Sequence, residues 1–336
     1  MSLRFVFGMA VLSVASLTQT ALPSQAQDAD KTFVIVVGSA AGGSYDANAR
    51  LLSRHIGKYL PGHPSVIVRN QPGAASMTAV RSLDLPSAKD GSTIVAFQSG
   101  LIGQSRLTPK EVPFDFRKYA WIGSITDDFS ACYVWRKPGI DSIHDLKGRK
   151  VVFGQSGPGT NADLYARILR NFLGVSLDLV AGYKGGAETS LAIERGELDG
   201  QCSSWGSVSA DWMDNHRITF LYRSSPKTPP ELKELNVPTM MELAANDRDR
   251  AIIRALVLDR ELARPFITSA DVPAERLKIL RDAFDQTMRD PEFLADAEKE
   301  RQLVDPKSSA EATKVVELIY SLPDDIIEAA RTVMAQ

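Results

Sequence analysis

The chain alternates short apolar runs with longer segments in which apolar residues recur every three or four positions. Phe33 to Val37 are apolar and mostly β-branched, which predicts a buried strand. From Ser44 to Leu60 the apolar residues share one side of a helix, with Ser44 as the expected N-cap and Asp46 in the first turn. The connection is built from small residues, with Gly42 and Gly43 adjacent. Such a turn places free N–H groups at the carboxyl edge of a sheet and predicts an anion site.

Two further strands end in the same way. Ser65–Arg69 runs into a loop of small residues that contains Gly73 and Ala74, and Thr93–Gln98 ends at Ser99. The carboxyl ends of parallel strands meet at one edge of an open sheet, which is where ligands bind. We therefore expect these small residues to lie beside the first glycine turn.

The pattern begins again near the middle of the chain. Lys150–Phe153 predicts a strand, residues 154–161 form a glycine-rich loop, and a helix from Ala162 ends at Gly174. This second strand, loop and helix predicts a second α/β domain that faces the first. One more strand is expected at Pro265–Ile267. Helices are expected at about Glu231–Leu235, Asp247–Leu258, Ala274–Arg289, Glu292–Arg301 and Ala310–Gln336.

Length and composition narrow the class of protein. The 336 residues suffice for two domains, and 44% apolar and 24% charged residues are ordinary for a globular protein. The net charge of −2 offers no electrostatic argument for nucleic acid or for an anionic membrane surface.

The N-terminus has the pattern of a secretory signal. Arg4 precedes the apolar run Phe5–Leu17, and Ser24 and Ala26 are small residues at the positions that a signal peptidase reads. We expect residues 1–26 to be a signal peptide that is cleaved after Ala26, and the mature protein to be periplasmic. An uncleaved anchor is the alternative. No later segment is apolar enough to predict a transmembrane helix.

Several kinds of chemistry are disfavoured by the motifs. The first glycine turn lacks the spacing of a dinucleotide fingerprint and the Gly-Lys-Ser/Thr of a P-loop. None of the four histidines lies in a metal or nucleophile motif. Gly154 to Pro158 resembles a nucleophile elbow around Ser156 but lacks its final glycine. We expect no cofactor, no metal and no enzymatic activity, with a secreted serine hydrolase as the less favoured alternative.

The two cysteines, Cys132 and Cys202, lie in or just after predicted strands of the same half of the chain. An oxidising compartment would allow them to form a disulfide, and two buried thiols are the alternative. Neither has a motif relation to a histidine that would suggest a catalytic thiol.

Four segments occur in the order that is found in the solute-binding receptors of the tripartite tricarboxylate transporter system, often called Bug receptors. They are AAGGSYDANARLL, VRNQPGAAS followed by KDGSTIV, FGQSGPGTNADL, and YKGGAETSLAIERGELDG. The likeness continues through RPFITSADVPAERLKIL. The chain resembles this family over nearly all of its length after Asp30. The resemblance implies an α/β, two-domain periplasmic-binding-protein fold (type II-like), hinged by two crossing strands. We expect residues 28–127 and 246–336 to form the first domain and residues 128–245 the second.

The resemblance also implies which residues hold the ligand. The expected ligand is a small carboxylate, either a di- or tricarboxylate or an aromatic acid, held mainly by backbone N–H groups. None of the candidate loops carries an arginine, so N–H groups, hydroxyls and helix dipoles would meet the charge, with Lys184 as a candidate cation. The residues after Asp199, Gly200 to Trp205, replace the usual apolar run and make the predicted cleft more polar. The candidate ligand residues are Ala41, Gly42, Gly43, Ser44, Asp46, Gly73, Ala74, Ser99, Ser156, Gly157, Gly159, Thr160, Asn161, Asp199 and Ser203.

For some of these residues a structural role competes with ligand contact. Asp46 and Asp199 are anionic and would repel a carboxylate, so each could instead brace a loop. The implied partner is a membrane permease of the tripartite tricarboxylate type, and we expect a monomeric receptor. A receptor that signals to a two-component system is an alternative that the sequence does not separate from transport.

Overall fold

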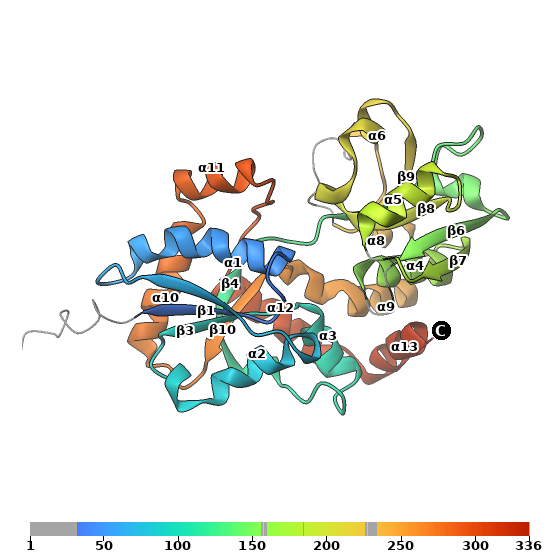
Figure 1. Cartoon of the computed structure of the whole chain (residues 1–336). Helices are drawn as coiled ribbons and strands as arrows, with labels where there is room; N and C mark the ends of the chain where they lie inside the picture. Colours follow the sequence, from blue (N-terminus) through green and yellow to red (C-terminus); the bar gives the residue numbers. More distant parts are fainter. Residues whose placement is uncertain are drawn as a thin grey trace, which may run out of the picture.

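The computed structural model describes residues 32–155, 157, 160–183, 185–225, 227 and 234–335. The expected signal peptide therefore lies outside the described residues, as do Ser156, Gly159 and Lys184. Figure 1 shows two lobes, each built on a β-sheet with helices on both faces. Within the described part of the chain, every helix is too short or too polar to cross a bilayer.

The first sheet has six strands in the order β11-β4-β10-β3-β1-β2. β1 is parallel to β2 and β3, whereas β10 is antiparallel to its neighbours β3 and β4. The carboxyl ends of β1, β2 and β3 therefore meet at one edge, as the sequence predicts. The strands are β1 (Phe33–Val37), β2 (Val66–Asn70), β3 (Thr93–Ala96), β4 (Tyr119–Ser124), β10 (Pro265–Ser269) and β11 (Lys307–Ser308).

The second sheet has five strands in the order β7-β6-β8-β5-β9. β6 is parallel to β7 and β8, and β5 is antiparallel to β8 and β9. In each sheet, an antiparallel strand directly follows a passage between the lobes, β10 in the first sheet and β5 in the second. The strands are β5 (Ser130–Trp135), β6 (Lys150–Gln155), β7 (Ser176–Ala181), β8 (Gly200–Ser204) and β9 (Ile218–Arg223).

Helices cover both faces of each sheet because alternate strand residues are apolar on both sides. In the first lobe, Phe33, Ile35 and Val37 pack with α1 and α10, while Val36 and Val95 pack with α2, α3 and α12. These helices are α1 (Ser44–His55), α2 (Met77–Arg81), α3 (Gly100–Leu107), α10 (Ala274–Thr287), α11 (Pro291–Lys299) and α12 (Ser309–Ser321).

In the second lobe, α4 packs on the face of the sheet that carries Cys132 and Phe153, and α5 and α6 cover the face that carries Tyr133. α9 and α13 share the buried cluster of α4, through Ile253 and Ala330 among others. The domain limits expected from the sequence remain a prediction. The helices are α4 (Asn161–Phe172), α5 (Gly186–Glu194), α6 (Ala210–Asp214), α8 (Met240–Leu243), α9 (Asp247–Val257) and α13 (Asp324–Ala335).

The chain passes between the lobes after α12, and two further connections cross between the lobes and run side by side. Residues 125–129 join β4 to β5, and the short 3-10 helix η9 (Leu258–Leu262) with the two residues after it joins α9 to β10. The N–H of Asp128 donates to the carbonyl of Arg260 at 3.1 Å, and the N–H of Ala263 donates to the carbonyl of Thr126 at 3.0 Å. Asp127 and Asp128 both lie in the first crossing segment.

Two helix predictions are corrected. The predicted helix Ala310–Gln336 is two helices, α12 and α13, because Pro323 cannot continue the first. The N-cap of α1 is Gly43 rather than Ser44, and no side chain caps this helix.

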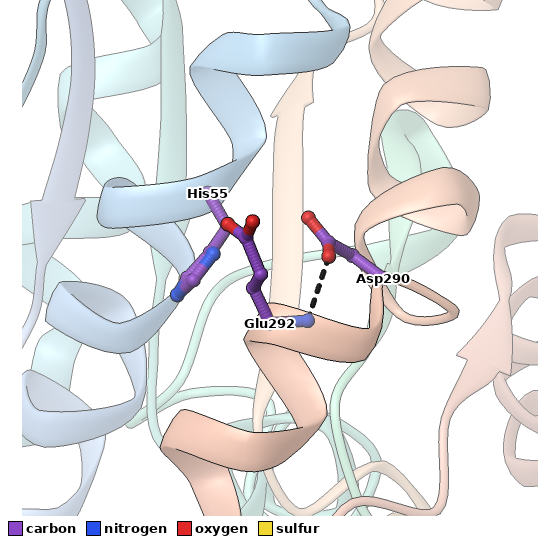
Figure 2. A group of neighbouring side chains, drawn as sticks. All are labelled: His55, Asp290 and Glu292. Carbon is purple, nitrogen blue, oxygen red and sulfur yellow. Dashed lines mark hydrogen bonds between the residues drawn. The ribbon is translucent and has the colours of Figure 1, made fainter.

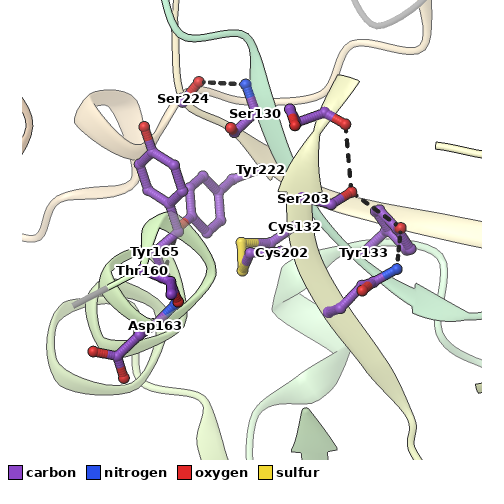
Figure 3. The surroundings of a disulfide bond; sticks show 12 residues. Ser130, Cys132, Tyr133, Thr160, Asp163, Tyr165, Cys202, Ser203, Tyr222 and Ser224 are labelled. Carbon is purple, nitrogen blue, oxygen red and sulfur yellow. Dashed lines mark hydrogen bonds between the residues drawn. A yellow bond between two sulfur atoms is a disulfide. The ribbon is translucent and has the colours of Figure 1, made fainter. Parts of the chain in front are cut away.

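A disulfide joins the two central antiparallel strands of the second sheet. Cys132 on β5 lies directly opposite Cys202 on β8, and the two sulfur atoms are bonded. Figure 3 places Tyr165 and Tyr222 on the side of the disulfide toward α4, and the Tyr222 hydroxyl donates to the carbonyl of Tyr165 at 2.7 Å. The structure therefore has the disulfide and not the two free thiols.

Asp127 in the first crossing segment is almost completely buried, with 8% of its surface exposed. Burial raises the pKa of Asp127 from 3.8 to about 6, although Lys307 partly opposes the shift. Its carboxylate accepts hydrogen bonds from the N–H of Asp128 at 2.7 Å and from the hydroxyl of Ser225 at 3.2 Å.

Reduction of the disulfide should destabilise the protein markedly. The cysteines are separated by 70 residues, so the cross-link removes about 4 kcal/mol of chain entropy from the unfolded state on the loop-closure model. We expect a reductant to lower the Tm of the wild-type protein and to leave unchanged that of a variant with both cysteines replaced by alanine. Two thiols titrating in the untreated folded protein would contradict this.

The buried Asp127 should make stability depend on pH. Its folded pKa is raised, so the bound proton stabilises the folded state fully below about pH 4, and this contribution is lost as the pH rises through about 6. Asp127→Asn, which mimics the protonated side chain, should raise the Tm at pH 8 and change it little at pH 4. Thermal unfolding of both proteins across this range tests the prediction, and a Tm difference independent of pH would disprove it.

Candidate ligand site

Three strand-to-helix turns of the first lobe lie together at the carboxyl edge of its sheet. Ala41, Gly42, Gly43 and Ser44 are exposed in the turn after β1. Gly73 and Ala74 are exposed after β2, and the exposed Gln98 and buried Ser99 follow β3. The predicted residues of this lobe are therefore brought to one edge.

Ser76, which the sequence analysis did not select, ties the three turns together. Its buried hydroxyl donates to the carbonyl of Gly38 at 2.9 Å and accepts from the N–H of Gln98 at 3.2 Å. Gly38 has no room for a side chain, because a Cβ there would lie 2.4 Å from the Cβ of Ser76. No sequence signal marked Ser76, since both of its partners belong to other strands.

The turn after β2 has an unusual backbone. Ala74, Ala75 and Ser76 have φ angles of 45°, 52° and 79°, and Gly73 before them has a φ of 141°. Left-handed conformations are unfavourable for residues with a side chain and concentrate at ligand clamps. The surrounding hydrogen bonds of Ser76 hold this strained turn in place, so it offers a preformed set of backbone groups.

Asp46 acts as a brace for the first turn. Its carboxylate accepts from the N–H of Gly42 at 2.8 Å, from Arg50 at 2.9 Å and from the amide of Asn70 at 2.9 Å. Burial alone would raise the pKa of Asp46, but these hydrogen bonds together lower it. With its oxygens engaged and only 2% of its surface exposed, we remove Asp46 from the proposed ligand contacts.

The start of α1 offers backbone donors to a ligand. The N-cap Gly43 has an extended conformation (φ −77°, ψ 165°), and no side chain satisfies the first N–H groups of the helix. These groups have no intrahelical partner, and the helix dipole adds a partial positive charge.

The corresponding start of α4 in the second lobe is capped differently. Thr160 is its N-cap, and its hydroxyl accepts from the N–H of Asp163 at 3.2 Å and donates to the carbonyl of Gly157 at 2.9 Å. The amide of Asn161 donates to Asp128 in the first crossing segment at 3.0 Å. The side chains of both predicted residues are thus engaged, and their backbone groups are what remains for a ligand.

Ser203 and Asp199 lie at opposite ends of β8. Ser203 is near the carboxyl end, partly exposed, and its hydroxyl lies 3.2 Å from that of Tyr133 (Figure 3). Asp199 precedes the strand, where its carboxylate pairs with Lys137 and accepts the N–H of Val152 at 2.8 Å. Asp199 therefore lies at the end of β8 that is remote from the turn after β6 and from Ser203, and its contact with the ligand stays a prediction.

Two arginines of the second crossing segment reach the turns of the first lobe. The guanidinium group of Arg264 lies 4.7 Å from the centre of the Tyr45 ring, and the hydroxyl of Tyr45 accepts the N–H of Ser99 at 3.3 Å. The guanidinium group of Arg260 lies against Gly100 at the start of α3. The sequence predicted no arginine at the site, because Arg260 and Arg264 are remote in the chain from the turns they approach.

Arg260 is largely buried, with 15% of its side chain exposed, and it pairs with Asp259 at 3.4 Å. Burial would lower the pKa of Arg260, but the charge of Asp259 leads a set of neighbours that raise it overall. The guanidinium group of Arg260 is therefore permanently charged. The Nε atoms of Arg260 and Arg264 are both buried and have no hydrogen-bond partner among the described residues.

Both sets of turns therefore meet the crossing segments. Tyr45 and Gly100 of the first lobe contact Arg264 and Arg260, and Asn161 of the second lobe contacts Asp128. These contacts place the helix starts of both lobes around the same pair of segments.

A separate cluster has metal-ligating residue types. His55, Asp290 and Glu292 have ligand atoms within 4.8 Å of one another (Figure 2). The ammonium group of Lys58 contacts both carboxylates, at 3.0 Å from Asp290, and His55 lies 3.0 Å from Asp296. The pKa of Lys58 is raised to about 12 by its bonds to Glu292 and Asp290. The ammonium group of Lys58 already balances these carboxylates, so we assign the cluster to ion pairing between the turn after α1 and the start of α11.

Replacing Gly38 by alanine should disturb the turns. The added Cβ overlaps Ser76 and should cost about 1–3 kcal/mol, as overpacking does. Gly43→Ala is the matched control, because the nearest heavy atom to a Cβ there is 3.5 Å away. We expect thermal unfolding to show a clear loss of Tm for Gly38→Ala and a small change for Gly43→Ala. Equal Tm values for the two variants would contradict the role of Ser76.

A curated protein of Agrobacterium vitis, the UPF0065 protein in the TAR-I ttuE-ttuC' intergenic region, is 26% identical to this chain over 288 residues. The match covers 82% of this chain and 78% of that protein. No protein-family model matches the chain.

Solved structures share the fold. A TctC solute binding protein from Polaromonas superposes with a TM-score of 0.70 at 16% identity, over 91% of this chain and 98% of that one. R. palustris Rpa4515 with adipate superposes with a TM-score of 0.63 at 19% identity, over 89% and 97% of the two chains. The predicted two-domain periplasmic-binding-protein fold is confirmed. In sequence and fold, the chain resembles the solute-binding receptors of the tripartite tricarboxylate transporter system, as its ordered motifs predict.

Proposed function

We propose that this protein is a periplasmic solute-binding receptor that captures a small carboxylate between its lobes and delivers it to a membrane permease of the tripartite tricarboxylate type. The observation that carries the proposal is the convergence of both sets of helix starts on the crossing segments. A solved structure that shares the fold, R. palustris Rpa4515, is described with adipate, which supports the ligand class.

The ligand is held mainly by backbone groups. The donors are the N–H groups at the starts of α1 and α4 and in the strained turn after β2, with Ser99 and Ser203 beside them. A charge-assisted hydrogen bond contributes about 1.5–3 kcal/mol. Three or four of them, less the cost of ordering, correspond to micromolar binding, or about −8 kcal/mol.

Arg260 and Arg264 supply the positive charge that the turns lack. Both belong to the second crossing segment, so their charge stays at the hinge in any arrangement of the lobes. A carboxylate near the hinge would attract the helix starts of both lobes and stabilise the closed form, which the permease would recognise.

Ligand binding should stabilise the mature protein. A di- or tricarboxylate or aromatic acid present at a hundred times its Kd should add about 2.7 kcal/mol to the free energy of unfolding. A thermal-shift screen of such acids, with their uncharged amides as controls, tests this. The proposed function fails if no acid in the screen raises the Tm.

A proline at the start of α1 should remove one donor without breaking the helix. Ser44 is the first helical residue, where proline is tolerated, and Gly43 already has the extended conformation that proline favours in its predecessor. Ser44→Pro should weaken binding of the acid found above about ten- to hundredfold, while Ser44→Ala keeps the N–H and isolates the hydroxyl. Isothermal titration measures both variants, and equal affinities for the two would exclude this N–H as a contact.

The same pair of substitutions can be made in the second lobe. Asn161 is the first residue of α4 and follows the extended Thr160 (φ −75°, ψ 162°). Asn161→Pro and Asn161→Ala both lose the bond to Asp128, so their difference in affinity reports on the N–H alone. We expect Asn161→Pro to bind the acid more weakly, and equal binding would remove this helix start from the site.

A further inference from the structure

We propose that a groove between the lobes holds an apolar part of the ligand, so that the protein selects carboxylates that carry an alkyl or aromatic group. The groove has a volume of about 360 Å³. Trp205 and Gly206 of the second lobe line one side, and Leu294, Ala297 and Leu303 of the first lobe line the other. The inference rests on the proposed function.

The walls of the groove expose apolar surface to water. Leu294 and Leu303 are each 41% exposed, and Trp205 is partly exposed while its ring packs against Phe220 at 5.8 Å. Large apolar side chains that are exposed side by side indicate a binding surface, because burying them is favourable. Glu298 and Arg301, which also line the groove, have opposite charges and leave it without net charge.

On the first lobe the groove adjoins the predicted carboxylate site. The amide nitrogen of Asn48 in α1 donates both to the carbonyl of Ser44 and to the side chain of Gln302, each at 2.8 Å. Gln302 lines the groove and Ser44 begins the helix. The side-chain nitrogen of Asn48 therefore links Gln302 in the groove to Ser44 at the start of α1.

On the second lobe the groove also lies close to the proposed carboxylate site. Ser203 lies at the carboxyl end of β8, and Trp205 follows two residues later. The N–H of Trp205 donates to the carbonyl of Phe129 in the first crossing segment at 2.6 Å. The groove is thus close to the proposed carboxylate site on both lobes, and we infer that a ligand with its acid at the helix starts extends an apolar group into it.

Affinity should rise with the length of that group. Each methylene that enters the groove should tighten binding about fourfold, until the groove is full. We would titrate the mature protein calorimetrically with two series, the unbranched alkanoates from butanoate to octanoate and the 2-alkylsuccinates from methyl to hexyl. The first series has one carboxylate and the second has two.

Leu294→Glu places a charge in the groove at an exposed position and should abolish the dependence on chain length, while binding of the shortest member is retained. Leu318→Glu on α12 is the matched control, because Leu318 is 44% exposed and does not line the groove. It should behave like the wild-type protein. Leu303→Glu provides a second groove variant outside a helix.

The outcomes separate the two proposals. If the acids bind but the wild-type affinity does not rise with chain length, or if Leu294→Glu and Leu303→Glu keep the wild-type dependence, the groove does not hold the ligand and the carboxylate site stands. If neither series binds to the wild-type protein and the screen of acids is also negative, the proposed function fails and this inference fails with it.

Discussion

The main-chain hydrogen bonds between the two crossing segments are the constraint on which the rest of the structure depends. They join Thr126 to Ala263 and Asp128 to Arg260. The two crossing segments are therefore held together by hydrogen bonds and cannot move independently of each other. The first crossing segment joins β4 of the first sheet to β5 of the second, and the second crossing segment leads into β10 of the first sheet. The paired segments therefore fix the positions of these three strand ends. The strand ends that carry the glycine turns are positioned relative to these segments.

The charge of the site follows from the same pairing. The turns themselves contribute small residues and backbone groups, which recognise an anion by geometry but carry no formal charge. The guanidinium groups come from the paired segments, where burial and the neighbouring Asp259 hold Arg260 in place. Asp128 belongs to the same segments, but three side chains already donate to it, those of Ser130, Tyr165 and Asn161. The carboxylate of Asp128 therefore has its hydrogen-bond donors in place, whereas the Nε atoms of Arg260 and Arg264 have no hydrogen-bond acceptor among the described residues.

The sequence predicts the local units well and the long-range contacts poorly. Strand, turn and helix appear where the apolar periodicity places them, because Phe33–Val37 and Lys150–Gln155 are apolar enough to be strands in any packing. Ser44 was expected at the N-cap position of α1, but the helix begins one residue earlier, so that Gly43 occupies this position. Asp199 was expected at the end of a strand near the ligand, yet it precedes β8 and pairs with Lys137. Periodicity does not reveal that Arg260 would approach Gly100, a residue remote in the chain.

Both lobes contain elements from the last third of the chain. β10 is inserted between β3 and β4, and α13, the last described helix, packs with α9 and α4 in the buried cluster of the second lobe. The strand order of the first sheet is therefore incomplete without Ser308, and the second cluster remains open on one side without α13. A fragment that ends before these segments would lack part of both folded lobes.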